Sequence, residues 1–316
     1  MTTRTLRVLV LGGYGAVGAP TTAALREAGH TCLTAGRDPH RADRPLDLTR
    51  PDDYRAALEG IDVVVNASGA EDPALAGIAA DRGAAFVDAT ATTGYIARVE
   101  RLTPRAPVLL SVGLAPGLTN LLAADLHAAH PGDDPIDVAV ILGAGEAHGA
   151  AATAWTIGLI GRSFADPTTG EPVRNLSRGA VFDLPGQGRR RLLRADFSDQ
   201  HTLTRDLGRP VRTHLGLDSP ALTRGLGLLA RLPGAGRLSK VPHLPGSDAW
   251  TVAARSGPHL RRARGRGQSR ATALLTAHSV GLAAALPPGV HHLHRVTTLT
   301  DLPALPGITL DVTTRA

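Results

Sequence analysis

The sequence predicts an α/β protein whose first 130 residues form a doubly wound parallel sheet. Short apolar runs, each the length of a strand, alternate with helical patterns from residue 6 to residue 129, as in right-handed parallel crossovers. A glycine-rich loop at residues 12–18 joins the first run to the first helical pattern. After about Pro131 the alternation gives way to paired strand signals, which indicates a second domain.

Each element of the first part follows from a local pattern. The run LRVLVL at 6–11 is mostly apolar, as a strand buried inside a parallel sheet must be. By the same criteria we expect strands at 30–35, 61–65, 85–88 and 107–111, and helices at 20–28, 52–58, 73–82 and 118–129.

The second part mixes both kinds of element. Strands are expected at 136–142 and 249–254, and antiparallel strands within 180–196. Helices are expected at 150–160, 217–232 and 271–285, the last ended by Pro287 and Pro288. The Gly- and Pro-rich stretch 234–246 is expected to be loop, and the basic run from Arg255 to Arg270 is expected to be solvated loop.

Composition narrows the function classes. A chain of 316 residues with 43% hydrophobic residues can build two domains with sizeable cores. The net charge of +6 is a mild excess without a nucleic-acid-binding motif, so we do not expect nucleic acid as a partner. The single cysteine, Cys32, excludes an internal disulfide. Because we find no signal peptide and no spanning segment, we expect a cytoplasmic protein without membrane contact.

The loop Gly12-Gly13-Tyr14-Gly15-Ala16-Val17-Gly18 lies between a predicted strand and a predicted helix, the context that gives such a motif its meaning. Gly13 is expected to turn the chain sharply, Gly15 to let a pyrophosphate approach the backbone, and Gly18 to let the helix pack closely. The N–H groups and partial positive charge of the helix N-terminus suit phosphates. The loop therefore predicts a Rossmann βαβ unit that binds a nicotinamide dinucleotide.

The end of the second strand bears on the choice of cofactor. NAD sites usually place Asp or Glu at this strand tip, where the acid holds the 2′-hydroxyl of the ribose. Here Ala35 and Gly36 are followed by Arg37, whose guanidinium suits the 2′-phosphate of NADP(H). We therefore expect NADP(H), although Asp38 is an acid one position later. Asp47, after the third strand, is expected either to line the adenine pocket or to cap a surface turn.

Polar residues follow the fourth and fifth strands. Asn66-Ala67-Ser68 and Asp88-Ala89 are expected to line the nicotinamide half, because ligands of such sheets lie outside the carboxyl ends of the strands. Ser68 could instead cap a helix, and Asp88 could instead hold its own loop through backbone amides. The full set expected to bind the cofactor is Gly13, Tyr14, Gly15, Ala16, Val17, Arg37, Asp47, Asn66, Ala67, Ser68, Asp88 and Ala89.

Three segments share a pattern with one known family. They are the glycine loop 12–18, the segment SVGLAPGLTN at 111–120, and the segment ATALLTAH at 271–278 with PGVHHL at 288–293. The second is similar to a Gly-x-x-Pro-Gly turn that leads into a helix. In these places the chain resembles the saccharopine dehydrogenase family in its shorter, single-chain reductase form, over about residues 5–130 and 268–295.

The resemblance implies two domains and a reaction. Residues 1–130 would form the NAD(P)-binding domain and residues 131–267 a second α/β domain with a mixed sheet. The C-terminal segment 268–316 would return to the Rossmann domain through its helix. The resemblance also implies hydride transfer to a C=N or C=O bond of a small-molecule substrate, and it leaves a homodimer open.

The candidate catalytic residues are few. Hydride transfer needs placement and a proton source, and the Tyr-x-x-x-Lys pair of short-chain dehydrogenases is missing because Lys240 is the only lysine. His148, after the first strand of the second domain, is the candidate proton donor, because an imidazole in solution titrates near neutrality. An ordinary exposed loop histidine is the alternative, and Glu146 of the same loop could serve instead if it is buried. Asn120 follows the Pro-Gly turn near the expected nicotinamide. No metal site is expected, because the C-terminal histidines alternate between strand faces without a fourth ligand: His291, His292 and His294.

Two other functions stay open at this point. The spacing of the glycine loop also fits atypical short-chain reductases that lack the Tyr and Lys pair. The chain could also be a non-catalytic protein that senses NADP(H) and binds a partner. The helix at 271–285 separates the two enzyme hypotheses, because only the first predicts that this helix returns to the N-terminal domain.

Overall fold

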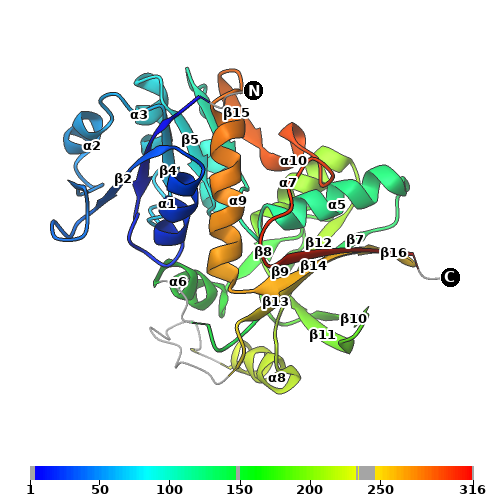
Figure 1. Cartoon of the computed structure of the whole chain (residues 1–316). Helices are drawn as coiled ribbons and strands as arrows, with labels where there is room; N and C mark the ends of the chain where they lie inside the picture. The colour runs from blue at the N-terminus through cyan, green and yellow to red at the C-terminus, as the bar shows by residue number, and fades with distance from the viewer. Residues whose placement is uncertain (1–3, 147–149, 233, 235–245, 315–316) are drawn as a thin grey trace. The chain divides into compact units, whose positions relative to one another are not determined.

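The structure, a computed structural model, describes residues 4–146, 150–232, 234 and 246–314, with the backbone alone at 150–153 and 313–314. The chain forms two compact units (Figure 1). The first contains residues 1–117 and 269–297, and the second contains residues 118–268 and 298–316. No helix of the described residues is long and apolar enough to cross a membrane.

The first unit is built on a seven-stranded sheet in which all neighbouring strands run parallel. The strand order β15-β6-β5-β4-β1-β2-β3 reverses between β1 and β4, which makes this the predicted doubly wound sheet. Its strands are β1 (Arg7–Leu11), β2 (Thr31–Gly36), β3 (Arg44–Pro45), β4 (Val63–Asn66), β5 (Ala85–Asp88), β6 (Pro107–Leu110) and β15 (Gly289–His292).

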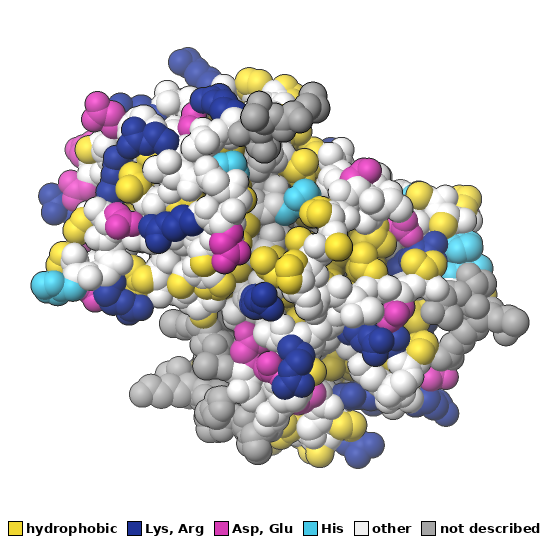
Figure 2. Space-filling view, viewed as in Figure 1, with side chains coloured by type: hydrophobic (Ala, Val, Ile, Leu, Met, Phe, Trp, Pro, Cys, Tyr) yellow, Lys and Arg dark blue, Asp and Glu magenta, His cyan; other side chains and the backbone are white. Residues whose placement is uncertain are grey.

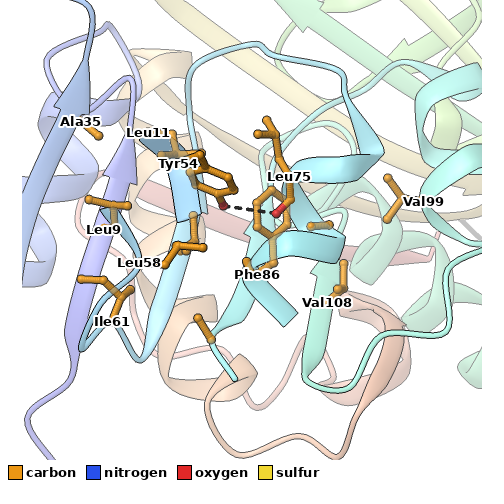
Figure 3. Close-up of a cluster of buried hydrophobic side chains, with 14 of the residues drawn as sticks. Leu9, Leu11, Ala35, Tyr54, Leu58, Ile61, Leu75, Phe86, Val99 and Val108 are labelled. Carbon is orange, nitrogen blue, oxygen red and sulfur yellow. Dashed lines mark hydrogen bonds between the residues drawn. The ribbon is translucent and has the colours of Figure 1, made fainter. Parts of the chain in front are cut away.

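The core of this unit explains why these runs form strands. Val63, Val64 and Val65 of β4 are all fully buried, because helices cover a parallel sheet on both of its faces. Figure 3 shows the cluster in which Tyr54 packs among the aliphatic side chains, and its hydroxyl donates to the Leu75 carbonyl at 3.2 Å. The helices that follow the strands are α1 (Gly18–Glu27), α2 (Pro51–Ala57), α3 (Pro73–Asp81) and α4 (Thr93–Val99).

The C-terminal helix returns to the first unit, as the resemblance implied. Helix α9 (Gln268–Ala283) and strand β15 come late in the chain but lie among the N-terminal elements, orange among blue and cyan in Figure 1. Strand β15 pairs with β6 and sets His292 opposite Leu110. The Leu114 N–H donates to the Thr272 hydroxyl of α9 at 3.3 Å. The short helix α10 (Leu293–Val296) follows β15.

The second unit has a mixed seven-stranded sheet of order β10-β11-β12-β7-β13-β14-β16. Only the central pair of β12 and β7 is parallel within this sheet. Its strands are β7 (Ile136–Leu142), β10 (Gly179–Leu184), β11 (Gly188–Arg194), β12 (Val211–Leu217), β13 (Ala249–Ser256), β14 (His259–Arg266) and β16 (Ile308–Thr314). The helices are α5 (Leu118–Ala129), α6 (Ala150–Leu159), α7 (Ser198–Leu207) and α8 (Pro220–Leu229), and β8 (Ser163–Ala165) pairs with β9 (Pro172–Arg174).

The basic run was expected to be solvated loop, and this expectation is wrong. Residues 259–266 form strand β14, in which Arg261 and Arg262 are only 6% exposed. Arg261 pairs with Asp125 of α5 and Arg262 with Asp311 of β16, so the two buried charges are matched. On the face drawn in Figure 2, basic side chains are scattered among acidic ones and do not gather in one patch.

The bounds of the units differ from those expected at residues 130 and 267. Helix α5 belongs to the second unit, where Asp125 pairs with Arg261 of β14. Strand β16 also belongs to the second unit, because it pairs with β14 along its length. Only residues 269–297 of the expected C-terminal segment therefore lie in the first unit.

Candidate cofactor site

The carboxyl ends of the parallel strands bring the predicted cofactor residues to one edge of the first sheet. The register sets Leu11 of β1 opposite Ala35 of β2 on one side and opposite Asn66 of β4 on the other. Asn66 in turn lies opposite Asp88 of β5. The glycine loop starts at this edge, at the point where the strand order reverses, which is where open α/β sheets bind their ligands.

The glycine loop is a tight turn against the first helix. The left-handed backbone lies at Gly12, with φ 70°, and so one residue before the Gly13 that we expected to turn the chain. The start of α1 packs so closely that a Cβ on Gly18 would lie 2.1 Å from the Gly12 carbonyl oxygen. The backbone of Ala67 and Ser68 lies against Gly12 in the same way. A loop this compact, at the start of α1, can place backbone N–H groups around a phosphate.

Tyr14 leaves the loop and packs against the end of β2. A Cβ on Gly36 would lie 2.5 Å from the Tyr14 hydroxyl, so only glycine fits beside this ring. The hydroxyl accepts a hydrogen bond from the Asp38 N–H at 3.2 Å. Arg41 sets its guanidinium 4.4 Å from the ring centroid and donates to the Tyr14 carbonyl at 3.1 Å.

Arg41 is not among the residues that the sequence predicted at this site. Its contact with Tyr14 spans 27 positions, which no local pattern reveals. The available signal was a second arginine four residues after Arg37, in the same short loop. Both arginines are exposed, so two guanidinium groups lie beyond the tip of β2.

The acids near this tip already accept hydrogen bonds from the chain. Asp38 accepts the His40 N–H at 2.9 Å, and Asp43 accepts both the N–H and the hydroxyl of Thr34. Asp47 accepts the N–H and hydroxyl of Thr49 ahead of α2. These bonds from Thr49, and more weakly the charge of Arg37, lower the pKa of Asp47. Asp47 thus has the geometry of the surface turn that was the alternative to an adenine contact.

Asn66, Ser68 and Asp88 form one hydrogen-bonded network at the ends of β4 and β5. Asn66 donates to the Asp88 carboxylate at 2.8 Å and accepts the Ser68 hydroxyl at 2.7 Å. Asp88 also accepts the Tyr95 hydroxyl and the Thr90 N–H, both at 2.7 Å. Burial raises the pKa of the Asp88 carboxyl, and the hydrogen bonds from Thr90, Tyr95 and Asn66 oppose this. The fully buried Asp88 therefore has the geometry of the loop-holding alternative.

Two solved structures are similar in fold to this chain. The chain matches saccharopine dehydrogenase from Saccharomyces cerevisiae with a TM-score of 0.62 and 13% identity, over 98% of this chain and 100% of that one. The fold resembles that of saccharopine dehydrogenase. A DAP dehydrogenase from C. glutamicum matches with a TM-score of 0.50 and 14% identity, over 94% of this chain and 95% of that one.

Two further comparisons concern sequence. Residues 8–94 match the model of the NAD dependent epimerase/dehydratase family, which covers the glycine loop and the ends of β2 and β4. No curated protein matches the chain. The resemblance expected from the sequence is thus confirmed at the level of the fold.

Of the two candidate catalytic residues, the structure describes only Asn120. His148 falls outside the described residues. Asn120 is fully buried on α5 of the second unit, and Glu146 accepts the Gln268 N–H at 2.6 Å. Of the C-terminal histidines, His291 bonds to the Pro287 carbonyl, and His292 bonds to Ser111 and Glu100. The described residues hold no cluster of three side chains that could bind a metal ion.

Proposed function

We propose that this chain is an NADP(H)-dependent oxidoreductase of the saccharopine dehydrogenase-like type that transfers a hydride to a C=N or C=O bond of a small molecule. The observation that carries the proposal is the compact glycine loop at the switch point of a parallel sheet, with two exposed arginines beyond the tip of β2. A loop of this kind holds a pyrophosphate, and the arginines lie on the side that receives the adenosine ribose.

The choice of NADP(H) rests on the charges at the tip of β2. Arg37 and Arg41 can offer their guanidinium groups to a 2′-phosphate, with matching charge and geometry. Asp38, the acid that follows Arg37 and could hold a ribose 2′-hydroxyl instead, accepts the His40 N–H with one of its oxygens. In this proposal Tyr14 orients Arg41 through its ring and its carbonyl.

The choice of an oxidoreductase rests on the fold. The family model over 8–94 bears the words NAD dependent, and the two solved structures compared above are dehydrogenases. The place of α9 in the first unit favours the saccharopine dehydrogenase-like hypothesis over an atypical short-chain reductase. The dinucleotide supplies the hydride when bound, and the chain supplies placement and a proton. His148 and Asn120 remain our candidates for the reacting side of the site.

Titration of the cofactors tests this proposal. We expect NADPH to bind the wild-type chain roughly ten- to a hundredfold more tightly than NADH, because a charge-assisted hydrogen bond contributes ~1.5–3 kcal/mol. Arg37→Ala and Arg41→Ala should each lower the affinity for NADPH and leave that for NADH unchanged. Arg50→Ala, an exposed arginine paired with Asp53 at α2, is the matched control. Equal affinities of the wild type for both dinucleotides would refute the preference for NADP(H). A second assay measures NADPH oxidation with a panel of imines and carbonyls, and turnover of any of them distinguishes an enzyme from a sensor.

A further inference from the structure

Ser111 holds an unusual backbone conformation directly after β6. Its φ is 59°, in the left-handed region that residues with a side chain rarely adopt, and the residue is fully buried. Such a conformation persists only where the surroundings over-determine it, and it is typical of functional sites. The neighbours of Ser111 therefore indicate what holds it.

The neighbour that holds Ser111 is His292, which comes from the end of β15. The Ser111 hydroxyl lies 3.0 Å from Nδ1 of His292, across 181 positions of sequence. Nε2 of the same ring lies 2.7 Å from the carboxylate of Glu100, at the end of α4. Ser111 and His292 are buried, while the Glu100 side chain is 23% exposed.

A serine, a histidine and an acid in this order also occur at the nucleophilic sites of hydrolases. Such a site needs the serine to be open to substrate and the acid to be buried. Here the order of burial is reversed, because Ser111 is inaccessible and Glu100 is the exposed end. The three residues are therefore arranged to hold the backbone at Ser111 and not to expose a nucleophile.

The turn that Ser111 begins lies at the cofactor edge of the sheet. Within it the Gly113 N–H donates to the Pro116 carbonyl at 2.9 Å. Gly113 packs between Thr272 of α9 and Ala89 after β5, where a Cβ would lie 3.2 Å and 3.6 Å from their side chains. The adenosine half of a dinucleotide takes the β1-β2 side of the switch point, so its other half faces the strands β4, β5 and β6.

We propose that Glu100 and His292 are positioning residues that fix Ser111 and so set the turn 111–117 as a wall of the nicotinamide pocket. This inference rests on the proposed function, because it needs a dinucleotide in the site. It predicts that loss of the contact between His292 and Ser111 weakens binding of the nicotinamide end alone. A purely structural role would instead lower stability and affect every part of the dinucleotide equally.

The test compares NADPH with 2′-phospho-ADP-ribose, which is the same molecule without its nicotinamide. Ser111→Ala and His292→Gln should lower the affinity for NADPH about tenfold, the effect of one lost hydrogen bond to a buried group, with the affinity for 2′-phospho-ADP-ribose unchanged. The fluorescence emission of bound NADPH reports the surroundings of the nicotinamide ring. We expect this emission to shift in both variants.

Matched variants sharpen the comparison. His292→Asn carries an amide near the position of Nδ1 and should retain most of the affinity for NADPH, whereas His292→Gln reaches toward Glu100 instead. His291→Gln, at the preceding residue of β15, should leave both affinities unchanged. If Ser111→Ala fails to fold, Ser111→Gly, which adopts this φ without strain, replaces it in the test.

The outcomes are distinct. Folded variants whose affinities for both ligands fall equally, or in which neither affinity falls, would overturn the positioning role while the proposed function stands. A wild-type chain that binds neither ligand would overturn the proposed function, and this inference with it.

Discussion

At the scale of single residues, the proposed pyrophosphate site depends on Gly15 having no side chain. A Cβ on Gly15 would meet only the Gly12 carbonyl oxygen, at 3.1 Å. The folded chain can therefore accept a side chain at this position after a small shift of its neighbour. We expect Gly15→Val to stay folded but to lose dinucleotide binding, because the branched side chain would occupy the space of the phosphates. Circular dichroism and a cofactor titration together check this, and an unchanged affinity in a folded variant would show that the loop is not the cradle.

Asp199 makes a second prediction at this scale, about pH. Its carboxyl is fully buried in the second unit and accepts the Thr213 hydroxyl at 2.6 Å, and burial raises its pKa. A raised pKa in the folded state means that stability is full below the ordinary value and falls as the pH rises through the folded value. We expect Asp199→Asn to raise the free energy of unfolding at neutral pH by on the order of 1 kcal/mol, and so to raise the unfolding temperature.

The pH dependence of the stability difference between Asp199→Asn and the wild type is the control for this prediction. The advantage of Asp199→Asn should shrink as the pH falls toward 4, because the wild-type carboxyl then becomes neutral too. Thermal unfolding from pH 4 to pH 8 measures this difference. A variant that is less stable at every pH would show that the charge of Asp199 is balanced within the fold.

At the scale of elements, strand β14 depends on acids brought from two other elements. Asp125 of α5 pairs with buried Arg261, whereas Asp248 pairs with Arg266, whose side chain is 74% exposed. We expect Asp125→Asn to destabilise the protein by about 1–3 kcal/mol, because it leaves a buried guanidinium without its partner charge. Asp248→Asn, the same change at an exposed pair, should cost less than about 1 kcal/mol.

Urea unfolding of the two variants gives the comparison. A double variant, Asp125→Leu with Arg261→Met, should recover much of the loss, because two apolar side chains can replace a buried pair. Equal effects of Asp125→Asn and Asp248→Asn would contradict the role that we assign to burial.

The sequence predicted elements well where their causes are local. Strand β5, strand β7 and helix α5 have the predicted bounds, because apolar runs and turn residues mark both of their ends. The prediction of a helix from 217 was wrong at its start, since 211–217 is strand β12 and α8 begins at Pro220. Strand β14 was missed because its arginines look solvated until Asp125 and Asp311 are brought beside them.

The candidate site also combines residues with local sequence signals and residues whose contacts come from distant parts of the chain. The glycine loop and Arg37 could be located from their neighbours in the sequence. The contact of Arg41 with Tyr14 and the contact of Ser111 with His292 join positions far apart, so only the folded chain reveals them. Asp88 looked like a ligand-binding residue from its place at a strand end, but which hydrogen bonds its carboxylate makes depends on Tyr95 of the next helix.

At the scale of the whole molecule, the first unit is not a continuous stretch of chain. A fragment of residues 1–117 lacks β15 and α9, so β6 becomes an open edge and Ser111 loses His292. We expect this fragment neither to unfold cooperatively nor to bind NADPH. Joining it through a flexible linker to residues 269–297 should restore both properties, as measured by circular dichroism and titration. A fragment 1–117 that binds like the full chain would contradict this.

The late arrival of β15 also matters while the chain is being made. His292 is added 181 residues after Ser111, which at ordinary rates of synthesis means a delay of roughly 10–40 s. Until then the strands β1 to β6 can emerge from the ribosome, but the edge of β6 has no neighbour and Ser111 has no partner ring. The sheet of the first unit can therefore be completed only after residues 118–268 of the second unit have been translated.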